Sequence, residues 1–330
     1  MKKRVATIRD VAAAAGVSTA TVSKFVNSTQ RFSSAVEARI SSVIEELGYR
    51  SNPMAQSMIT GRTKAIGLSV LDITNPHFTS VVKGANRVAQ AHGYTVLLVD
   101  TEETPGRERQ LLEALSRRVD GMIVYSRTPE EEMDWLPALN RPAVYFGRPE
   151  YLKLPAVSSD DQLGAFMVTR HLATQGHRRV AYLGFPNSRR DGERLAGVRE
   201  ALAALGLAPA VFAGEAPTAL AGEKACSAIL LGRQPPDALV CFNDLMALGF
   251  LKAARELGFR VPDDISVVGF DNIQFGSFAT PALTSVDLQS ERMGAAAMQK
   301  LLASIDGQEV EALTVIDAQL VLRDSTTTRA

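Results

Sequence analysis

A short polar stretch near the N-terminus carries side chains suited to contacting a polyanion. Ser18, Thr21 and Ser23 bring hydroxyl groups that can hydrogen-bond phosphate oxygens. The amide of Asn27 can do the same. Lys24 is the longest donor of the stretch. Its ammonium group could donate to guanine O6 or N7, or equally contact a phosphate as a point charge.

The spacing of apolar residues places part of this stretch on the outer face of a helix. Val22 and Val26 lie four residues apart, so they can anchor one side of the helix to a core. Thr19 and Ala20 at the start of the helix then face outward, toward base edges if the helix lies in a DNA groove. Ala20 offers only apolar contact there, for example with a thymine methyl group.

Charge is divided unevenly along the chain of 330 residues. Residues 1–64 hold ten Lys or Arg against four Asp or Glu, a net charge of +6. Because the whole chain is formally neutral, residues 65–330 carry −6. A basic head joined to an acidic body favours nucleic acid as the partner of the head.

Three short helices are predicted in the head. The first covers residues 8–15, with Thr7 as its N-cap, and the second follows Ser18 as N-cap and ends near residue 27. Two short helices joined by a glycine-containing turn form a helix-turn-helix. A third helix over 33–48 completes a small core.

From residue 65 onward, apolar runs alternate with helical patterns. The candidate strands are 66–71, 95–99, 121–125, 143–146, 180–183, 238–242 and 265–270. The candidate helices are 78–92, 107–117, 164–175, 192–205, 219–231, 244–257 and 291–305. Strand and helix in repeated order predict right-handed crossovers and parallel sheets covered on both faces. The predicted fold class is a small all-α helix-turn-helix domain plus an α/β domain of two parallel-sheet subdomains.

Residues 7–27 resemble the DNA-binding signature of the lactose-repressor/galactose-repressor family of bacterial regulators. Further landmarks of the family follow in its order over nearly the whole chain: Leu47-Gly48-Tyr49, Asn52-Pro53, Gly61-Arg62-Thr63, Ile66-Gly67-Leu68, Asn75-Pro76, Gly176-His177-Arg178-Arg179, Arg194-Leu195-Ala196-Gly197, Asn243-Asp244, residues 265–271 and residues 283–286. The resemblance implies a sequence-specific DNA-binding repressor under the control of a small-molecule effector. It also implies a periplasmic-binding-protein-like body.

The resemblance suggests where the functional segments begin and end. The helix-turn-helix domain is expected over 1–50, a hinge helix or linker over 51–62, and the effector-binding and dimerisation domain over 63–330. Within that domain, subdomain N is expected over about 63–163 and 291–319. Subdomain C is expected over about 164–290 and 320–330.

The hinge segment is expected to add DNA contacts. By resemblance it orders on DNA and inserts an apolar side chain into the minor groove; Met58 stands where the family usually has Leu. The alternative is that Met54 and Met58, four residues apart, pack on a neighbouring element. We assign to DNA contact Thr7, Ser18, Thr19, Ala20, Thr21, Ser23, Lys24, Asn27, Asn52, Ala55 and Met58.

Polar residues after two predicted strands point to a ligand cleft. Asn243 and Asp271 each follow an apolar run, and the carboxyl ends of parallel strands are where such folds bind ligands. Taken singly, each would be read as a helix cap or surface charge. With the family's positions added, the expected effector-binding residues are Asn75, His77, Phe78, Tyr125, Ser126, Gly147, Asn187, Arg194, Asn243 and Asp271.

The charge of the effector is left open between a sugar and a sugar acid. Gly147 stands where sugar-binding relatives often carry Asp, so one carboxylate acceptor is missing. Arg148, Arg189, Arg190 and Arg194 make an acidic sugar or phosphorylated sugar a reasonable hypothesis. Arginines that are merely solvated at the surface are the alternative.

Several other classes of protein are disfavoured. The chain has no GxSxG, no Walker A motif and no GxGxxG after its first strand, so no enzyme is expected. Cys226 and Cys241 show no metal-ligand spacing and are expected as buried free thiols; no metal or cofactor is expected. No run of about 18 apolar residues occurs, so neither export nor a membrane partner is expected.

The expected partners are near-palindromic double-stranded operator DNA, a carbohydrate-like effector and a second copy of the chain. A homodimer would place two heads in successive major grooves, and without a leucine-heptad tail no tetramer is expected. The expected location is the cytoplasm, with the nucleoid. A periplasmic-type solute-binding protein without a transcriptional role is the alternative, but it leaves the basic head unexplained.

Overall fold

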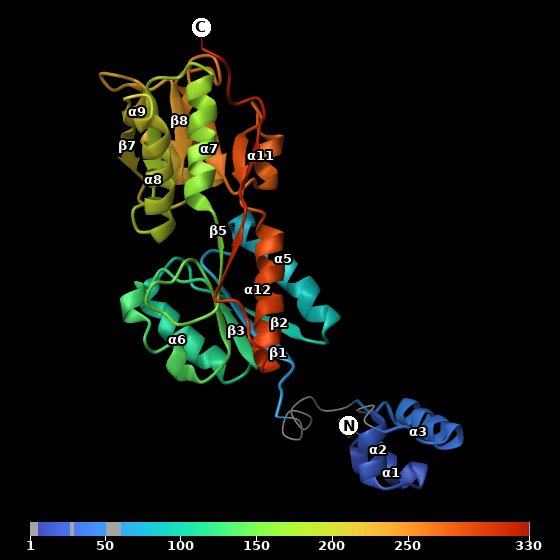
Figure 1. Ribbon diagram of the computed structural model, residues 1–330. Coiled ribbons are helices and arrows are strands. Elements are labelled where there is room, and N and C mark those ends of the chain that lie inside the picture. Colours follow the sequence, from blue (N-terminus) through green and yellow to red (C-terminus); the bar gives the residue numbers. More distant parts are fainter. Residues whose placement is uncertain (1–5, 27–29, 51–60, 330) are drawn as a thin grey trace. The chain divides into compact units, whose positions relative to one another are not determined.

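The computed structural model describes residues 6–26, 30–50 and 61–329, which form two compact units, Met1–Lys64 and Ala65–Ala330 (Figure 1). In its described residues, the first unit is all-helical, and the second holds two six-stranded sheets flanked by helices. The predicted fold class is therefore confirmed.

Side-chain caps fix the helices of the first unit. These are α1 (Ile8–Ala15), α2 (Thr19–Val26) and α3 (Ser34–Leu47). Thr7 and Asp10 form a capping box on α1, in which the Asp10 carboxylate accepts from the Thr7 backbone N–H at 2.8 Å. The Ser18 hydroxyl accepts from the backbone N–H of Thr21 at 3.1 Å at the start of α2. Both predicted N-caps are confirmed. The small core comprises Val11, Ala12, Ala15, Val22, Ile40 and Val43.

The first sheet of the larger unit has the strand order β11-β5-β4-β3-β1-β2, and all its neighbouring pairs are parallel. We call this half the N-subdomain. Helices α5 (Pro76–Ala91) and α12 (Ser290–Ile305) cover one face, and α6 (Pro105–Ser116) covers the other. Its strands are β1 (Ala65–Val70), β2 (Thr95–Asp100), β3 (Gly121–Val124), β4 (Ala143–Phe146), β5 (Ala156–Ser159) and β11 (Leu313–Ile316).

The second sheet, which defines the C-subdomain, has the order β12-β10-β9-β8-β6-β7. Helices α7 (Asp161–Thr174) and α8 (Arg189–Ala203) pack on one face, and α9 (Ala219–Leu230) and α10 (Asp244–Glu256) on the other. A short helix, α11 (Gln274–Phe278), follows β9. The strands are β6 (Val180–Gly184), β7 (Ala210–Ala213), β8 (Ala238–Cys241), β9 (Ser266–Phe270), β10 (Thr284–Asp287) and β12 (Gln319–Val321).

The chain crosses between the two subdomains three times, from β5 to α7, from β10 to α12 and from β11 to β12 (Figure 1). Every strand and helix that the sequence predicted in the body is present, with ends shifted by a few residues. The sequence did not predict β5, β7, β10, β11 and β12. Both sheets are mostly parallel, as predicted, and the exception is β12, which runs antiparallel to β10. This follows from the third crossing, which returns the chain as an edge strand.

Two glycines let α5 and α12 touch through their backbones. A Cβ at Gly84 would lie 1.9 Å from the carbonyl oxygen of Glu291, and one at Gly294 would lie 2.0 Å from that of Val81. Any side chain at either position would force the helices apart. The helix pair therefore depends on glycine on both sides of its crossing.

Candidate functional site

The outer surface of α2 presents the residues that the sequence assigned to base edges. Thr19, Ala20 and Lys24 are exposed, while Val22 is fully buried and anchors the helix to the core. Lys24 Nζ donates to Gln30 Oε1 at 2.9 Å. Thr21 and Ser23 are half-buried. The exposed N-terminal half of α2 can therefore enter a DNA groove without disturbing the core.

Two of the predicted DNA contacts are helix caps in this structure. Thr7 and Ser18 remain exposed while their hydroxyl groups bind the first turns of α1 and α2. Their role toward DNA stays a prediction. Asn27, Asn52, Ala55, Met58 and the predicted hinge helix lie outside the described residues.

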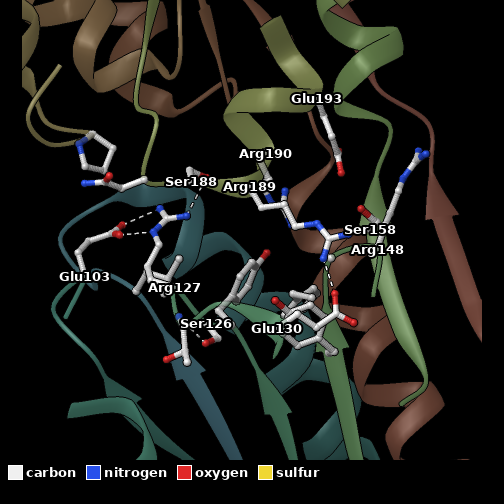
Figure 2. A pocket seen from close by; sticks show the side chains of 18 of the residues that line it. Glu103, Ser126, Arg127, Glu130, Arg148, Ser158, Ser188, Arg189, Arg190 and Glu193 are labelled. Carbon is white, nitrogen blue, oxygen red and sulfur yellow. Dashed lines mark hydrogen bonds and ion pairs between the residues drawn. The ribbon is translucent and has the colours of Figure 1, made fainter. Parts of the chain in front are cut away.

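A cleft of about 500 Å³ lies between the N- and C-subdomains (Figure 2). Its walls come from the loops after β1, β3, β4, β6, β8 and β9, at the carboxyl ends of the parallel strands. All ten residues that the sequence assigned to the effector line this one cleft: Asn75, His77, Phe78, Tyr125, Ser126, Gly147, Asn187, Arg194, Asn243 and Asp271. A ligand of sugar size fits a cavity of this volume.

Two of these residues also cap helices. Asn75 Oδ1 accepts from the backbone N–H of His77 at 3.0 Å at the start of α5. Asn243 Oδ1 accepts from the N–H of Met246 at 2.9 Å, and its Nδ2 donates to the carbonyl of Pro217. Asn243 is therefore both a helix cap and a cleft residue, and its amide keeps one N–H group and one oxygen lone pair for a ligand.

Arg194 is held in the wall of the cleft by a carboxylate that the sequence reading missed. Asp161, fully buried, lies 2.7 Å from both Nε and Nη2 of Arg194. The guanidinium also donates to the carbonyl of Phe242 and lies over the rings of Phe242 and Phe270. Burial alone would raise the pKa of Asp161, but Arg194 and Arg190 outweigh it and hold the pKa below its ordinary value.

His77, Tyr125 and Asp271 form a buried polar group at the base of the cleft. His77 Nδ1 lies 2.9 Å from Ser290 Oγ and 3.7 Å from Asp271, and its Nε2 lies 3.5 Å from Tyr125 Oη. Burial, and then repulsion from Arg190, lowers the pKa of His77 to about 3. Burial also raises the pKa of Asp271 to about 7 and that of Tyr125 to about 12. Near neutral pH His77 and Tyr125 are therefore uncharged, while Asp271 is about half ionised.

Aromatic side chains and a glycine with a positive φ shape the N-subdomain side of the cleft. Tyr125 stacks on Phe146 with ring centroids 4.1 Å apart, and Phe78 meets Tyr125 edge-on at 5.2 Å. Gly147 has φ +148, and a Cβ there would lie 2.8 Å from the Tyr145 ring. An aspartate at this position would require the loop to move, so the backbone conformation of the loop favours glycine here.

The loop after β3 is fixed by another carboxylate that sequence reasoning missed. Glu108 of α6 is fully buried and accepts from Ser126 Oγ, from the N–H of Arg127 at 2.8 Å and from Thr128 Oγ1 at 2.7 Å. Its position in an otherwise ordinary amphipathic helix gave no signal, because all these donors lie almost twenty residues away in sequence.

Each arginine of the cleft faces a carboxylate. Arg127 pairs with Glu103 and donates to Ser188 across the cleft at 2.8 Å (Figure 2). Arg189 reaches from the C-subdomain to Glu130 and Glu150. Arg148 lies 3.3 Å from Asp160, and Arg190 lies 3.5 Å from Asp161. The four arginines that suggested an acidic effector therefore provide no excess of positive charge.

Neither a metal centre nor a membrane span is found in the part of the chain that the structure describes. No group of three or more His, Cys, Asp or Glu is placed to hold a metal ion within residues 6–26, 30–50 and 61–329. None of the helices in these ranges has both the length and the apolar character needed to cross a membrane. Cys226 and Cys241 are buried free thiols, as predicted.

An exposed polar face on a helix-turn-helix and a polar cleft between two α/β subdomains together define a ligand-responsive DNA-binding regulator. Residues 7–52 match the lacI family of bacterial regulatory proteins, and residues 169–326 match the periplasmic binding protein-like domain. The chain belongs to the lacI family of bacterial regulatory proteins.

Relatives and solved structures match over almost the full length. The HTH-type transcriptional repressor CytR of Escherichia coli K12 is 34% identical over 98% of this chain and 97% of its own. A crystal structure of the lac repressor dimer, bound to operator and the anti-inducer ONPF, matches with a TM-score of 0.90 at 27% identity, over 98% of this chain and 100% of that chain. A complex of the regulator CelR with cellobiose matches at 0.72 and 30% identity, over 97% and 99%.

Proposed function

We propose that this chain represses transcription by binding near-palindromic operator DNA as a homodimer, and that a carbohydrate-like molecule in the cleft changes its affinity for that DNA. The observation that carries the proposal is the convergence of all ten predicted effector residues on one cleft, in a chain whose head exposes the N-terminal face of α2. The sugar class is supported by the cellobiose complex of CelR. The cleft then binds rather than catalyses, and the cytoplasm, where the DNA lies, is the proposed location.

The proposed functional segments are a DNA-reading head over 1–50, a hinge over 51–62 and an effector-binding and dimerising body over 63–330. Dimerisation is supported by exposed aromatic side chains in the C-subdomain. Phe275 and Phe278 on α11 are 56% and 72% exposed. Large apolar side chains grouped at the surface favour association with another protein surface.

Effector and DNA are proposed to act on one another through the angle between the subdomains. A ligand that closes the cleft changes that angle, and the three chain crossings transmit the change to the start of β1. Any effect of effector on operator affinity must then be matched by an equal effect of operator on effector affinity.

The DNA-reading face is tested by a matched pair of substitutions in the full chain. Ala20 on α2 and Ala38 on α3 are both exposed, so Ala20→Asp and Ala38→Asp make the same change at two surfaces. We expect Ala20→Asp to weaken binding to a duplex selected from random sequence by at least a hundredfold, because the new carboxylate faces base edges and phosphates. Ala38→Asp should stay within a few-fold of the wild type.

Fluorescence anisotropy at fixed salt measures both affinities. Equal losses of DNA affinity in the two variants would mean that α2 is not the helix that contacts the base edges. A wild-type chain that selects no duplex at low salt would overturn the DNA-binding function itself and favour the solute-binding alternative.

A further inference from the structure

Two charged residues of α8 keep hydrogen-bonding capacity that the other side chains of the cleft do not use. Arg190 and Glu193 lie three residues apart, so they share one face of the helix, and both line the cleft. Figure 2 shows Glu193 extending from α8 toward the part of the cleft that holds Arg148 and Ser158. Arg127, Arg189 and Arg194 already have carboxylate partners.

Arg190 is held in place by its neighbours, but one nitrogen of its guanidinium makes no hydrogen bond. Its Nη1 donates to Ser159 Oγ at 3.1 Å, and its guanidinium lies 5.6 Å from the centre of the Tyr125 ring. The same Nη1 lies 3.5 Å from Asp161, a longer contact than the 2.7 Å between Asp161 and Arg194. The Nη2 of Arg190 is buried and has no hydrogen-bond partner, and the same is true of Nε of Arg148. Buried donors without acceptors are costly, so a ligand that supplies acceptors here is favoured.

Glu193 contributes the opposite chemistry. Its carboxylate is half-buried and lies within the electrostatic influence of Arg190 and Arg148, which act to lower its pKa. Burial, and then repulsion from Asp161, outweigh this effect and raise its pKa. A ligand that donates hydrogen bonds to this carboxylate would stabilise it, whereas a ligand carboxylate would add repulsion.

We propose that Arg190 and Glu193 form a donor–acceptor pair that selects an effector with adjacent neutral hydroxyl groups over its acidic counterpart. A hydroxyl group can both accept from Arg190 and donate to Glu193, so neighbouring hydroxyls satisfy both side chains. A carboxylate or phosphate in place of one of these hydroxyls can only accept, so it would satisfy Arg190 and leave Glu193 without a donor and repelled. This inference rests on the proposed carbohydrate-binding function and names the residues that decide between a sugar and a sugar acid.

The test uses matched ligands against the full chain. D-Glucose and D-galactose are compared with D-glucuronate and D-galacturonate, and cellobiose with cellobionate, by thermal shift and then by isothermal titration calorimetry. Deoxy sugars that lack one hydroxyl of each adjacent pair test the need for both groups. We expect at least one neutral sugar to bind at least tenfold more tightly than its acid and its deoxy form, the ratio that one lost hydrogen bond to a charged group predicts.

Variants then assign that preference to the pair. Glu193→Gln should weaken binding of the neutral sugar about tenfold. It should also reduce the ratio of the affinities for the neutral and the acidic ligand by at least tenfold, because the charge that repels the acid is gone. Arg190→Met should weaken binding of the neutral sugar at least tenfold. Arg199→Met and Glu200→Gln make matched changes at exposed positions of α8 and should alter neither ratio. Far-UV circular dichroism and a cooperative thermal transition in each of the four variants check that they are folded.

Three results would overturn the proposal. Tighter binding of an acid than of its neutral partner would identify Arg190 as part of an anion site. Wild-type affinity and selectivity in Glu193→Gln would mean that Glu193 does not face the ligand. If the neutral sugars bind but neither variant changes their ratios, this inference fails while the proposed function stands; if no carbohydrate binds, both the inference and the carbohydrate part of the proposed function fail.

Discussion

Replacing Asp161 by Asn tests how strongly the body depends on one buried carboxylate. Asp161 has no exposed surface, contacts Arg194 at 2.7 Å and accepts from Ser159 Oγ at 2.6 Å. Asparagine keeps the size but removes the charge, so two guanidinium groups lose their shared counter-ion. Removing one partner of a buried ion pair costs about 3–5 kcal/mol. For a domain of this size, that lowers Tm by about 6–20 °C.

The neighbouring residue supplies the control. Asp160 is partly exposed, caps α7 through the N–H of Leu163 at 3.0 Å and pairs with Arg148 at 3.3 Å. Asp160→Asn should cost only about 1 kcal/mol, because asparagine still caps a helix and an exposed pair contributes little. Differential scanning calorimetry of the full chain compares the two variants. If Asp161→Asn unfolds within 2 °C of Asp160→Asn, the buried pair contributes no more than a surface pair and the reasoning is wrong.

The same carboxylate sets a dependence on pH. Folding lowers the pKa of Asp161, so its contribution is fully present above the unfolded value near 3.8 and is lost as the pH falls through the folded value. Below about pH 4 the wild type should therefore lose free energy of unfolding more steeply than Asp161→Asn. Parallel curves in denaturant titrations at several pH values would contradict this.

Three further predictions address other parts of the structure. Thr7→Ala removes the capping box of α1 and should destabilise the head by about 1 kcal/mol, seen as roughly fivefold faster hydrogen exchange of the Val11 and Ala12 amides, with no change in the body. Glu108→Gln replaces an acceptor of four loop hydrogen bonds by an amide that also donates, so it should lower stability by about 1–3 kcal/mol and weaken effector binding, unlike Glu113→Gln on the same helix. From pH 7 to pH 5 the wild type should lose about 2 kcal/mol of its free energy of unfolding, because His77, with a folded pKa of about 3, gains its proton only on unfolding. His77→Asn should not show this loss. Equal changes in the free energy of unfolding of the two proteins over this range would count against the prediction.

The elements that the sequence predicted well are those governed by local chemistry. Thr7 and Ser18 were identified as caps because capping depends on residues within one turn. Asn243 and Asp271 were placed in the cleft because the carboxyl ends of parallel strands meet at one edge of a sheet. Long apolar runs gave the central strands. In each case the deciding partners lie close in sequence or follow from the topology.

What could not be predicted depends on partners far along the chain. The strands β5, β11 and β12 have three or four residues and no long apolar run, so only pairing in the sheet defines them. Arg194 was expected at the effector, but its partner Asp161 lies 33 residues earlier. Glu108 and the loop that it fixes are similarly separated. The charge balance of the cleft therefore required the structure, although its location did not.

The glycine crossing of α5 and α12 determines how a movement at the cleft travels. Because the two backbones touch at Gly84 and Gly294, we expect the two helices to move together as one rigid pair. α5 starts at the cleft with Asn75, and α12 starts directly after a crossing between the subdomains. A movement at either end should then rotate the N-subdomain rather than slide one helix past the other. We expect Ala65, the first residue of β1, to follow that rotation, so that a ligand in the cleft would displace the chain that leads to the head.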